Sequence, residues 1–264
     1  MIPYVCDLPA PDGFRVLWNE GEARADIVLD RPPLNVVSMP EREQLAETFA
    51  ALDRDPRVRV IVLRGEGKHF SSGGNIAGFL EASAETVSHL ADNVAAPERC
   101  GKPVIAAIRG YCFGVGFELA LACDFRVAAE SAEFALPEMR LGMIPGSGGS
   151  ARLLNMIGIA RTKEIAMLGR RVAAPDARAW GFITSCVADD ALDQAVAALV
   201  GELRGFSPLA QRTLKRVLNA GQNMPLRSAI ELEGQAYGRL RTSADFKEGV
   251  AAFQEKRKPN FRGE

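Results

Sequence analysis

Strands and helices alternate along the chain up to about residue 190, and this alternation constrains the fold more than any other feature of the sequence. The expected strands are short apolar runs at 25–29, 58–63, 104–108 and 125–128. Segments expected to be helical lie between them, at 41–52, 83–93 and 116–122. Such an alternation indicates an α/β fold.

The last part of the chain is expected to be entirely helical, because segments with a strand pattern stop at about residue 191. Four helices are expected there, at 191–203, 208–220, 225–240 and 244–256. We therefore divide the chain into an α/β body, residues 1–195, and a helical C-terminal region, residues 196–264. The first dozen residues contain Pro3, Pro9 and Pro11 and are expected to form an extended arm.

Composition excludes several classes of partner. Lys and Arg number 32 against 33 Asp and Glu, so no overall field attracts nucleic acid or an anionic membrane. No apolar run is long enough to span a bilayer, and the N-terminus lacks the pattern of a secretory signal. The five cysteines include no C-x-x-C pair and are odd in number, which favours reduced thiols and a cytoplasmic location.

Two glycine-containing turns offer backbone N–H groups to a ligand. Gly73 and Gly74 lie in the segment HFSSGGNI, which taken alone is better explained as a tight turn of small residues. Gly114 and Val115 lie in GYCFGVGFELALACD, just before an apolar helix. Free N–H groups at a helix start bind negative charge, so this second turn is suited to stabilise an oxyanion.

Two glutamates lie on otherwise apolar segments. Glu118 falls in the first turn of the expected helix, where a carboxylate also interacts favourably with the helix dipole and needs no further role. Glu138 follows Pro137 in FALPEMRLGMIPGSGG. Adding water to an enoyl thioester requires oxyanion donors, one group that deprotonates water and one that protonates the α-carbon. Two carboxylates in an apolar pocket can divide those proton transfers, so the combined pattern fits this reaction.

Other chemistries find little support in the sequence. His69 and His89 are the only histidines and lie in no ligand-like cluster, so no metal site is expected. Ser71 and Ser72 have no nearby histidine base that would make a nucleophile. The glycine-rich turn at 145–149 lacks the Lys-Ser/Thr pair of a P-loop.

Over roughly residues 22 to 262 the chain resembles the crotonase superfamily of enoyl-CoA hydratases and isomerases, and its motifs are most similar to those of the hydratases. The matching segments are LDRPPLN (29–35), HFSSGGNI (69–76), KPVIAAIRGYCFGVGFELALACD (102–124), FALPEMRLGMIPGSGGSARL (134–153), GRRVAAPDARAWGFI (169–183) and FQEKRKPNF (253–261). The resemblance implies a spiral of stacked ββα turns followed by a helical trimerisation region, assembled as trimers or hexamers. It also implies syn hydration of a 2-enoyl-CoA to a 3-hydroxyacyl-CoA, as in fatty-acid β-oxidation. CoA then arrives with the substrate, and no further cofactor or metal is expected.

The same resemblance implies which residues act. The N–H groups of Gly74 and Val115 would form the oxyanion hole, Glu118 would activate the water, and Glu138 would protonate the α-carbon. Gly146 would line the pocket near the water. The implied contacts with the CoA thioester are Ser72, Gly74, Asn75, Ile76, Ala77 and Val115, joined by Phe253 and Lys256, often from a neighbouring subunit.

Val115 stands where the family commonly has glycine, so its N–H can serve only if its φ is ordinary and negative and its side chain points away. Three further departures from the family pattern leave the substrate open. Asn75 stands where Asp is usual, the proline turn before Asn35 is one residue shorter than the commonest pattern, and Leu136 stands where hydratases of short chains often have Gln. An isomerase using Glu138 alone, a hydrolase or decarboxylase on the same scaffold, and a non-catalytic CoA- or RNA-binding member remain alternatives.

Overall fold

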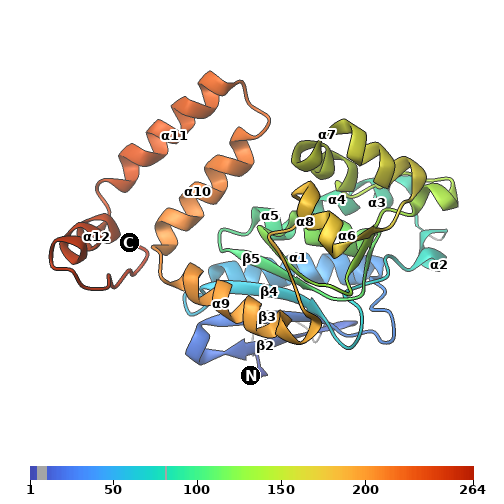
Figure 1. Ribbon diagram of the computed structural model, residues 1–264, viewed down its shortest axis with the longest axis horizontal. Helices are drawn as coiled ribbons and strands as arrows, with labels where there is room; N and C mark the ends of the chain where they lie inside the picture. The colour runs from blue at the N-terminus through green and yellow to red at the C-terminus, as the bar shows by residue number, and fades with distance from the viewer. Residues whose placement is uncertain (5–10, 81) are drawn as a thin grey trace.

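A seven-stranded sheet forms the centre of the molecule in the computed structural model, which describes residues 1–4, 11–80 and 82–264 (Figure 1). Its strands lie in the order β1 (Ile2–Pro3), β2 (Phe14–Asn19), β3 (Arg24–Leu29), β4 (Val60–Gly65), β5 (Val104–Ile108), β7 (Phe125–Ala129) and β10 (Ser185–Val187). Pairing is antiparallel from β1 to β3 and parallel from β3 to β10. Parallel neighbours need crossover connections, and helices supply them here. The predicted α/β body is confirmed.

A smaller sheet positions the two segments that carry glutamates. It contains three strands among the described residues, in the order β6 (Tyr111–Phe113), β8 (Glu133–Ala135) and β9 (Val172–Ala173). Strand β6 leads directly into helix α6 (Val115–Ala122), and β8 is followed by the short 3-10 helix η2 (Glu138–Leu141). Because β6 and β8 pair in parallel, the segments that follow them leave the sheet at the same edge.

Helices cover both faces of the large sheet. The helices on the first face are α1 (Met39–Arg54), α4 (Leu90–Val94), α5 (Ala96–Arg99), α6, α7 (Gly149–Leu168, interrupted at Gly158) and α8 (Ala174–Trp180). Helix α9 (Leu192–Arg204) covers the second face. Strand β4 serves both sides, since Ile61 and Leu63 join the first core and Val60 and Val62 the second. Strands buried on both faces read as continuous apolar runs, and this run was the signal that predicted β4.

The division of the chain after residue 195 falls inside α9. Leu192, Val196, Val200 and Leu203 of this helix are buried against β4, β5 and β7. Each buried apolar side chain contributes about 1.5–3 kcal/mol, so the whole helix belongs with the sheet. The α/β body therefore continues to Arg204.

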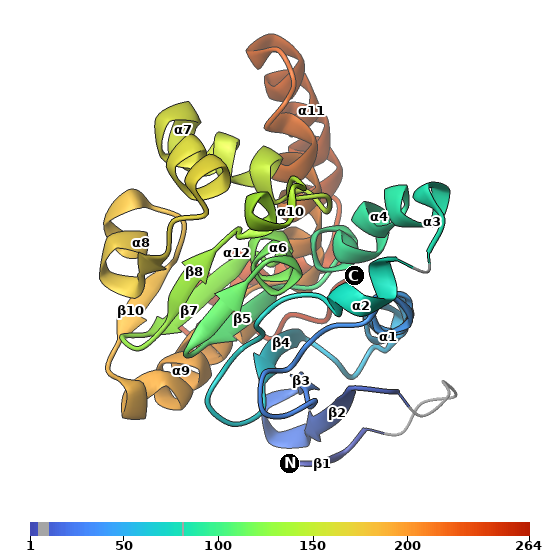
Figure 2. The ribbon, with the colours of Figure 1, turned by 90° about the vertical axis from the view of Figure 1, so that its right-hand side faces the viewer.

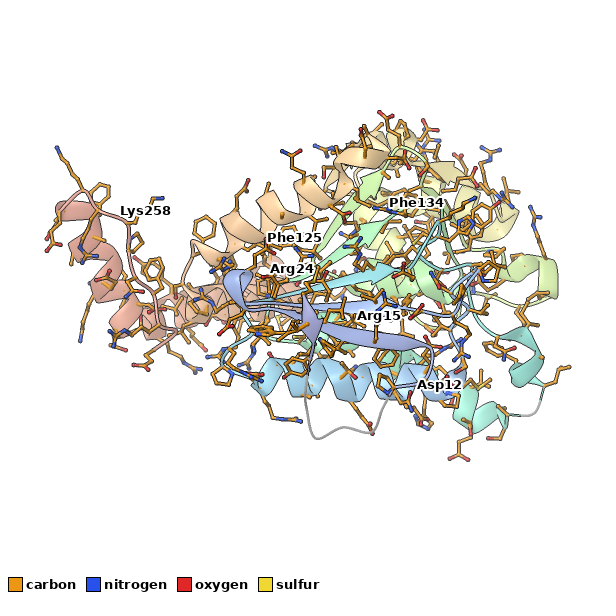
Figure 3. All side chains as sticks on the ribbon, turned by 90° about the horizontal axis from the view of Figure 1, so that it is seen from below. Asp12, Arg15, Arg24, Phe125, Phe134 and Lys258 are labelled. Atoms are coloured by element: carbon orange, nitrogen blue, oxygen red, sulfur yellow. The ribbon has the colours of Figure 1, made fainter. Side chains whose placement is uncertain are left out.

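Three helices follow the body and extend away from it (Figure 1). They are α10 (Pro208–Gly221), α11 (Leu226–Leu240) and α12 (Ala244–Gln254), and α10 packs along α11. Figure 3 shows Lys258 at the far end of these helices, while Phe134 lies in the body. Neither α10 nor α11 contains a buried residue. Large apolar side chains therefore remain exposed in a single protomer, among them Leu214, Leu218, Leu226, Ile230, Tyr237, Val250 and Phe253.

The remaining elements are short. They are α2 (Ile76–Phe79), α3 (Ala84–Ser88) and the 3-10 helices η1 (Glu20–Glu22) and η3 (Asp189–Ala191). The expected N-terminal arm is described only in part, and there Ile2–Pro3 pairs with β2. Cys6 lies outside the described residues, and the four cysteines within them are free thiols. Within the described part of the chain, no helix has the length and apolar character needed to cross a membrane.

Candidate active site

Two glycine turns meet at the start of α6, the helix that lies near the middle of the view in Figure 2. Gly73 has φ 118° and Gly114 has φ 51°, conformations that favour glycine over other residues. A side-chain carbon on Gly73 would lie 3.4 Å from the carbonyl oxygen of Phe113, and one on Gly114 would lie 3.6 Å from the Cα of Gly73. The two turns are therefore in van der Waals contact.

Each turn presents one unoccupied N–H group. The N–H groups of Gly74 and Val115 donate to no acceptor among the described residues. Val115 is the first residue of α6, and an N–H in that position has no partner within its own helix. Its side chain is buried in the core and its φ is not positive, so the ordinary backbone conformation expected for this valine is confirmed.

Glu118 is a buried carboxylate held by a second loop. Its side chain is 3% exposed, and its Oε1 accepts hydrogen bonds from the N–H groups of Ser147 (2.8 Å) and Gly149 (3.1 Å). Burial raises the pKa of Glu118, while the two N–H donors and the charges of Arg42 and Arg152 act in the opposite direction. The carboxylate form is thus specifically supported in a site that otherwise disfavours charge.

Glu138 faces the same turn but lacks that support. A side-chain carbon on Gly114 would lie 3.1 Å from its Oε1, and its Oε2 is buried with no hydrogen-bond partner among the described residues. Burial first, and then the negative charge of Glu118, raise the pKa of Glu138 to about 7, although its own backbone N–H acts in the opposite direction. Near neutral pH this group can therefore carry a proton. Two carboxyl groups with different environments are the arrangement that permits one acid and one base.

The glycine-rich loop beside Glu118 is fixed by Arg152. The Nη1 of this residue donates to the carbonyl oxygen of Ser147 at 3.1 Å, and its Nε donates to Oε2 of Glu98 at 2.9 Å. Arg152 lies on α7 and Glu98 on α5, so the loop is anchored to two helices. Anchoring matters because the N–H groups that hold Glu118 belong to this loop.

The structure brings together Gly74, Val115, Glu118 and Glu138, as the resemblance implied. Gly146 is adjacent but exposed, and a side-chain carbon there would meet open space. Its neighbours Ser147 and Gly149, rather than Gly146 itself, contact Glu118.

The expected contacts with CoA fall in two places. Ser72, Asn75, Ile76 and Ala77 follow the chain from the first glycine turn into α2, and the last three are exposed. Phe253 is 85% exposed at the end of α12, at the opposite end of the protomer from α2 (Figure 1). Phe253 and Lys256 therefore do not join the site of their own protomer.

Sequence reasoning missed four residues of the site, namely Ser147, Gly149, Arg152 and Arg42. The first three lie in a segment that had been singled out for its glycines, but nothing in it indicated a contact with Glu118. Arg42 carried a usable signal. It shares the helical spacing of Leu45, Phe49 and Leu52 and so places a charge on a buried face.

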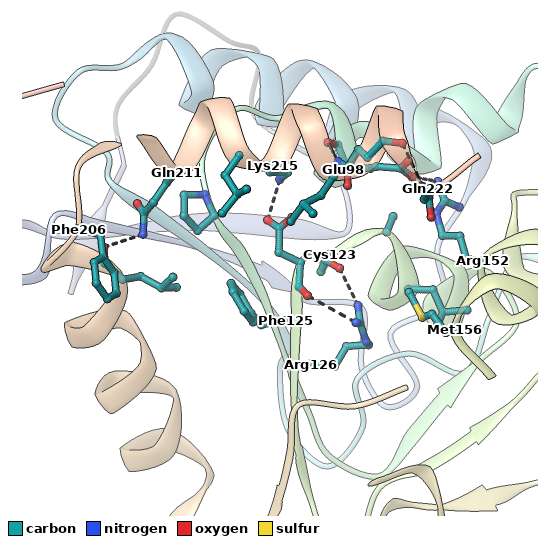
Figure 4. A pocket seen from close by; sticks show the side chains of 18 of the residues that line it. Glu98, Cys123, Phe125, Arg126, Arg152, Met156, Phe206, Gln211, Lys215 and Gln222 are labelled. Carbon is teal, nitrogen blue, oxygen red and sulfur yellow. Dashed lines mark hydrogen bonds and ion pairs between the residues drawn. The ribbon is translucent and has the colours of Figure 1, made fainter. Parts of the chain in front are cut away.

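A separate cleft of about 760 Å³ lies between α10 and the body (Figure 4). Its apolar lining includes Leu121, Phe125 and Leu218, and none of the four residues that meet at the glycine turns lines it. Lys215 of α10 bridges the cleft, because its ammonium group donates to the carbonyl oxygens of Pro97 (2.8 Å) and Lys102 (3.0 Å) and to Oδ2 of Asp124 (2.7 Å).

Comparison with known proteins gives consistent matches over nearly the whole chain. The family model described as enoyl-CoA hydratase/isomerase matches residues 19–264. Carnitinyl-CoA dehydratases of Salmonella typhi and Citrobacter koseri are each 37% identical over 246 residues, which cover 90% of this chain and 94% of theirs.

Solved structures match equally well. An enoyl-CoA hydratase from Bacillus anthracis superposes with a TM-score of 0.88 at 33% identity, covering 96% of this chain and 100% of that one. An enoyl-CoA hydratase from Mycobacterium smegmatis gives a TM-score of 0.88 at 28% identity, with coverage of 95% and 99%.

Proposed function

The chain belongs to the enoyl-CoA hydratase/isomerase family, the crotonase superfamily of CoA-thioester enzymes, and from that premise we propose that it catalyses the syn addition of water to a 2-enoyl-CoA. The product is a 3-hydroxyacyl-CoA, and dehydration is the same reaction in reverse. The observation that carries the proposal is the pair of glutamates, Glu118 buried and Glu138 half-buried, that meet beside two unoccupied N–H groups.

The thioester carbonyl oxygen binds between the N–H groups of Gly74 and Val115. Negative charge develops on this oxygen when water attacks C3, because the electrons of the double bond move toward the carbonyl. Two N–H donors fixed by the backbone stabilise that charge without reorganising. The positive end of the α6 dipole adds to the effect.

Glu118 acts as the base and Glu138 as the acid. The Glu118 carboxylate accepts a proton from water while the water oxygen bonds to C3. Glu138 delivers its proton to C2 as the enolate collapses, so the elements of water have been added, Glu118 has gained one proton and Glu138 has lost one. Proton exchange with solvent then returns both groups to their starting states. The different support of the two groups favours this assignment, since Oε1 of Glu118 accepts from two N–H donors whereas Oε2 of Glu138 has no hydrogen-bond partner among the described residues.

An isomerase would shuttle one proton through Glu138 and would leave Glu118 without a task. The two N–H donors on Glu118 argue for a working carboxylate, and the relatives named as dehydratases support water chemistry. Hydrolase and decarboxylase activities share the oxyanion hole but need no second carboxyl group.

Two reactions test the proposal. Hydration of crotonyl-CoA is measured by the loss of absorbance of the conjugated thioester, and dehydration of carnitinyl-CoA by the gain of that absorbance. Branched, aromatic and cyclic enoyl-CoA thioesters complete the screen. Products of the enoyl thioesters should gain the mass of one water, and the product of carnitinyl-CoA should lose it. Conversion of an enoyl thioester with no change of mass would instead support the isomerase.

The C-terminal helices complete the proposal by assembling the protein. Exposed apolar side chains on α10 to α12 need a partner surface, and we expect a trimer or hexamer in which Phe253 and Lys256 reach the CoA of a neighbouring subunit. Light scattering should report a mass that is a multiple of three protomers. A stable monomer at micromolar concentration would contradict both the assembly and the shared CoA contact.

A further inference from the structure

Arg42 differs from the other buried arginines of the body. Its side chain is 3% exposed, and its Nε is buried with no hydrogen-bond partner among the described residues. Within the same residues it forms no ion pair. By contrast, Arg24 pairs with Asp26, and Arg126 donates to several backbone carbonyl oxygens. A buried cation without an acceptor destabilises the fold, so its retention needs an explanation.

Helix α1, which carries Arg42, does not explain why an arginine is retained at this buried position. Ser38 begins α1 with a capping box closed by Glu41, which places Arg42 in the first turn. A positive charge at this end of a helix interacts unfavourably with the helix dipole. The ring of Phe79 stacks on the guanidinium at 5.3 Å, but a stacked ring contacts only the face and leaves the in-plane N–H donors unused.

The guanidinium faces the active site. A side-chain carbon on Gly74 would lie 2.9 Å from its Nη2, so Arg42 packs directly against the turn that contributes an oxyanion donor. Its charge also acts on Glu118. Arg42 therefore borders the site at the Gly74 turn, and its charge reaches the glutamate proposed to activate water.

We propose that Arg42 binds a carboxylate carried by the acyl group, so that the preferred substrate is the CoA thioester of a dicarboxylic acid. This inference rests on the proposed function, since it takes a CoA thioester as the ligand. The planar donors of arginine match a carboxylate in a bidentate pair. Without Arg42, the Glu118 carboxylate would repel such a substrate. A cationic acyl group, such as the trimethylammonium-bearing carnitinyl group, would meet like charge instead.

Binding of unreactive saturated thioesters tests the inference without catalysis. Succinyl-, glutaryl- and adipoyl-CoA are compared by calorimetry with the neutral thioesters of the same chain lengths. At one length or more, the dicarboxylic thioester should bind at least about tenfold more tightly, as expected for charge-assisted hydrogen bonds. Arg42→Met should abolish the preference, so that the dicarboxylic and the neutral thioester of the same length bind with Kd values within about threefold of each other. Arg42→Lys should retain part of the preference for the dicarboxylic thioester, because the positive charge remains while the planar pair of N–H donors is lost.

Arg54→Met is the matched control, since Arg54 is exposed on the same helix and should leave the preference unchanged. The melting temperature of Arg42→Met should not fall, because an apolar residue replaces an unpaired buried charge. Equal affinities at every chain length in the wild type, or a preference that survives Arg42→Met, would overturn the inference. The wild-type comparison decides even where a variant fails to fold. Failure of all the thioesters to bind would contradict the proposed function as well, whereas equal binding contradicts the inference alone.

Discussion

Glu118 lies in an eight-residue helix whose residues are all buried, whereas Glu138 begins a four-residue 3-10 helix that contains no buried residue. The first carboxylate is held by two N–H donors from a loop that Arg152 anchors. The second has an oxygen with no partner in the described structure. The two carboxyl groups thus have environments that meet two different requirements of proton transfer. A base must remain ionised in a dry site and so needs fixed donors, whereas an acid must hold its proton and so needs their absence.

The largest expected effect comes from removing either carboxyl group. Glu118→Gln and Glu138→Gln should each lower kcat for hydration by about 10²–10⁴-fold, the usual range for general acid–base catalysis. Binding of a saturated acyl-CoA, measured by calorimetry, should survive in both variants. Full hydration by Glu118→Gln would remove its role in activating water and would favour the isomerase.

Removing one N–H donor of the oxyanion hole should lower kcat somewhat less than removing a carboxyl group. Val115→Pro deletes the N–H at the first position of α6, a position where proline is otherwise well accepted in helices. We expect kcat to fall by about 10²–10³-fold, as for the loss of one oxyanion donor. Circular dichroism and light scattering check fold and assembly. A folded, assembled and fully active variant would show that the oxyanion binds elsewhere.

The pH profile separates the two glutamates directly. Hydration requires protonated Glu138, whose pKa is raised to about 7, so kcat/KM should fall as pH rises above that value, approaching about tenfold per pH unit. It requires ionised Glu118, whose pKa is also raised above its ordinary value, so activity should fall again on the acid side. The residual activity of Glu138→Gln should lack the alkaline fall. A wild-type kcat/KM that stays constant between about pH 6 and about pH 9 would contradict the assignment of Glu138 as the acid.

The smallest effect on activity should come from Val115→Gly. The N–H donor remains, so kcat should change by less than about threefold from the wild-type value, far less than the loss expected for Val115→Pro. Stability should fall, because the valine side chain is buried in the core, and the melting temperature gives that measurement. A large loss of activity with intact assembly would mean that the side chain itself shapes the site.

The sequence predicts Glu118, Glu138, Gly74 and Val115 as site residues because each lies in a local motif. It does not predict that the N–H groups of Ser147 and Gly149 fold onto Glu118, since that contact joins segments about thirty positions apart through a sheet and a loop. Strand β2 was missed because its burial is only partial at an outer position of the sheet.

The boundary expected after residue 195 falls inside α9 for a similar reason. Apolar spacing identifies a helix, but it does not say whether the apolar face of α9 packs on the sheet or on another helix. Burial of Arg42 likewise followed from its spacing on α1, whereas the lack of a hydrogen-bond acceptor for its Nε among the described residues is visible only in three dimensions.

The three bonds of Lys215 give the C-terminal helices the mechanics of a lever. All three ammonium protons are engaged by the body, and Asn219 one turn further on donates to the carbonyl oxygen of Glu98 at 3.0 Å, so α10 is pinned to the body over this short stretch beside the cleft. Helix α11 has 15 residues and spans about 22 Å, and it carries α12 at its far end. A tilt of about 10° at the pin therefore moves that end by roughly 4 Å, about the width of one side chain. A small rotation of α10 about these contacts would thus be amplified at Phe253 and Lys256, which lie far from Lys215.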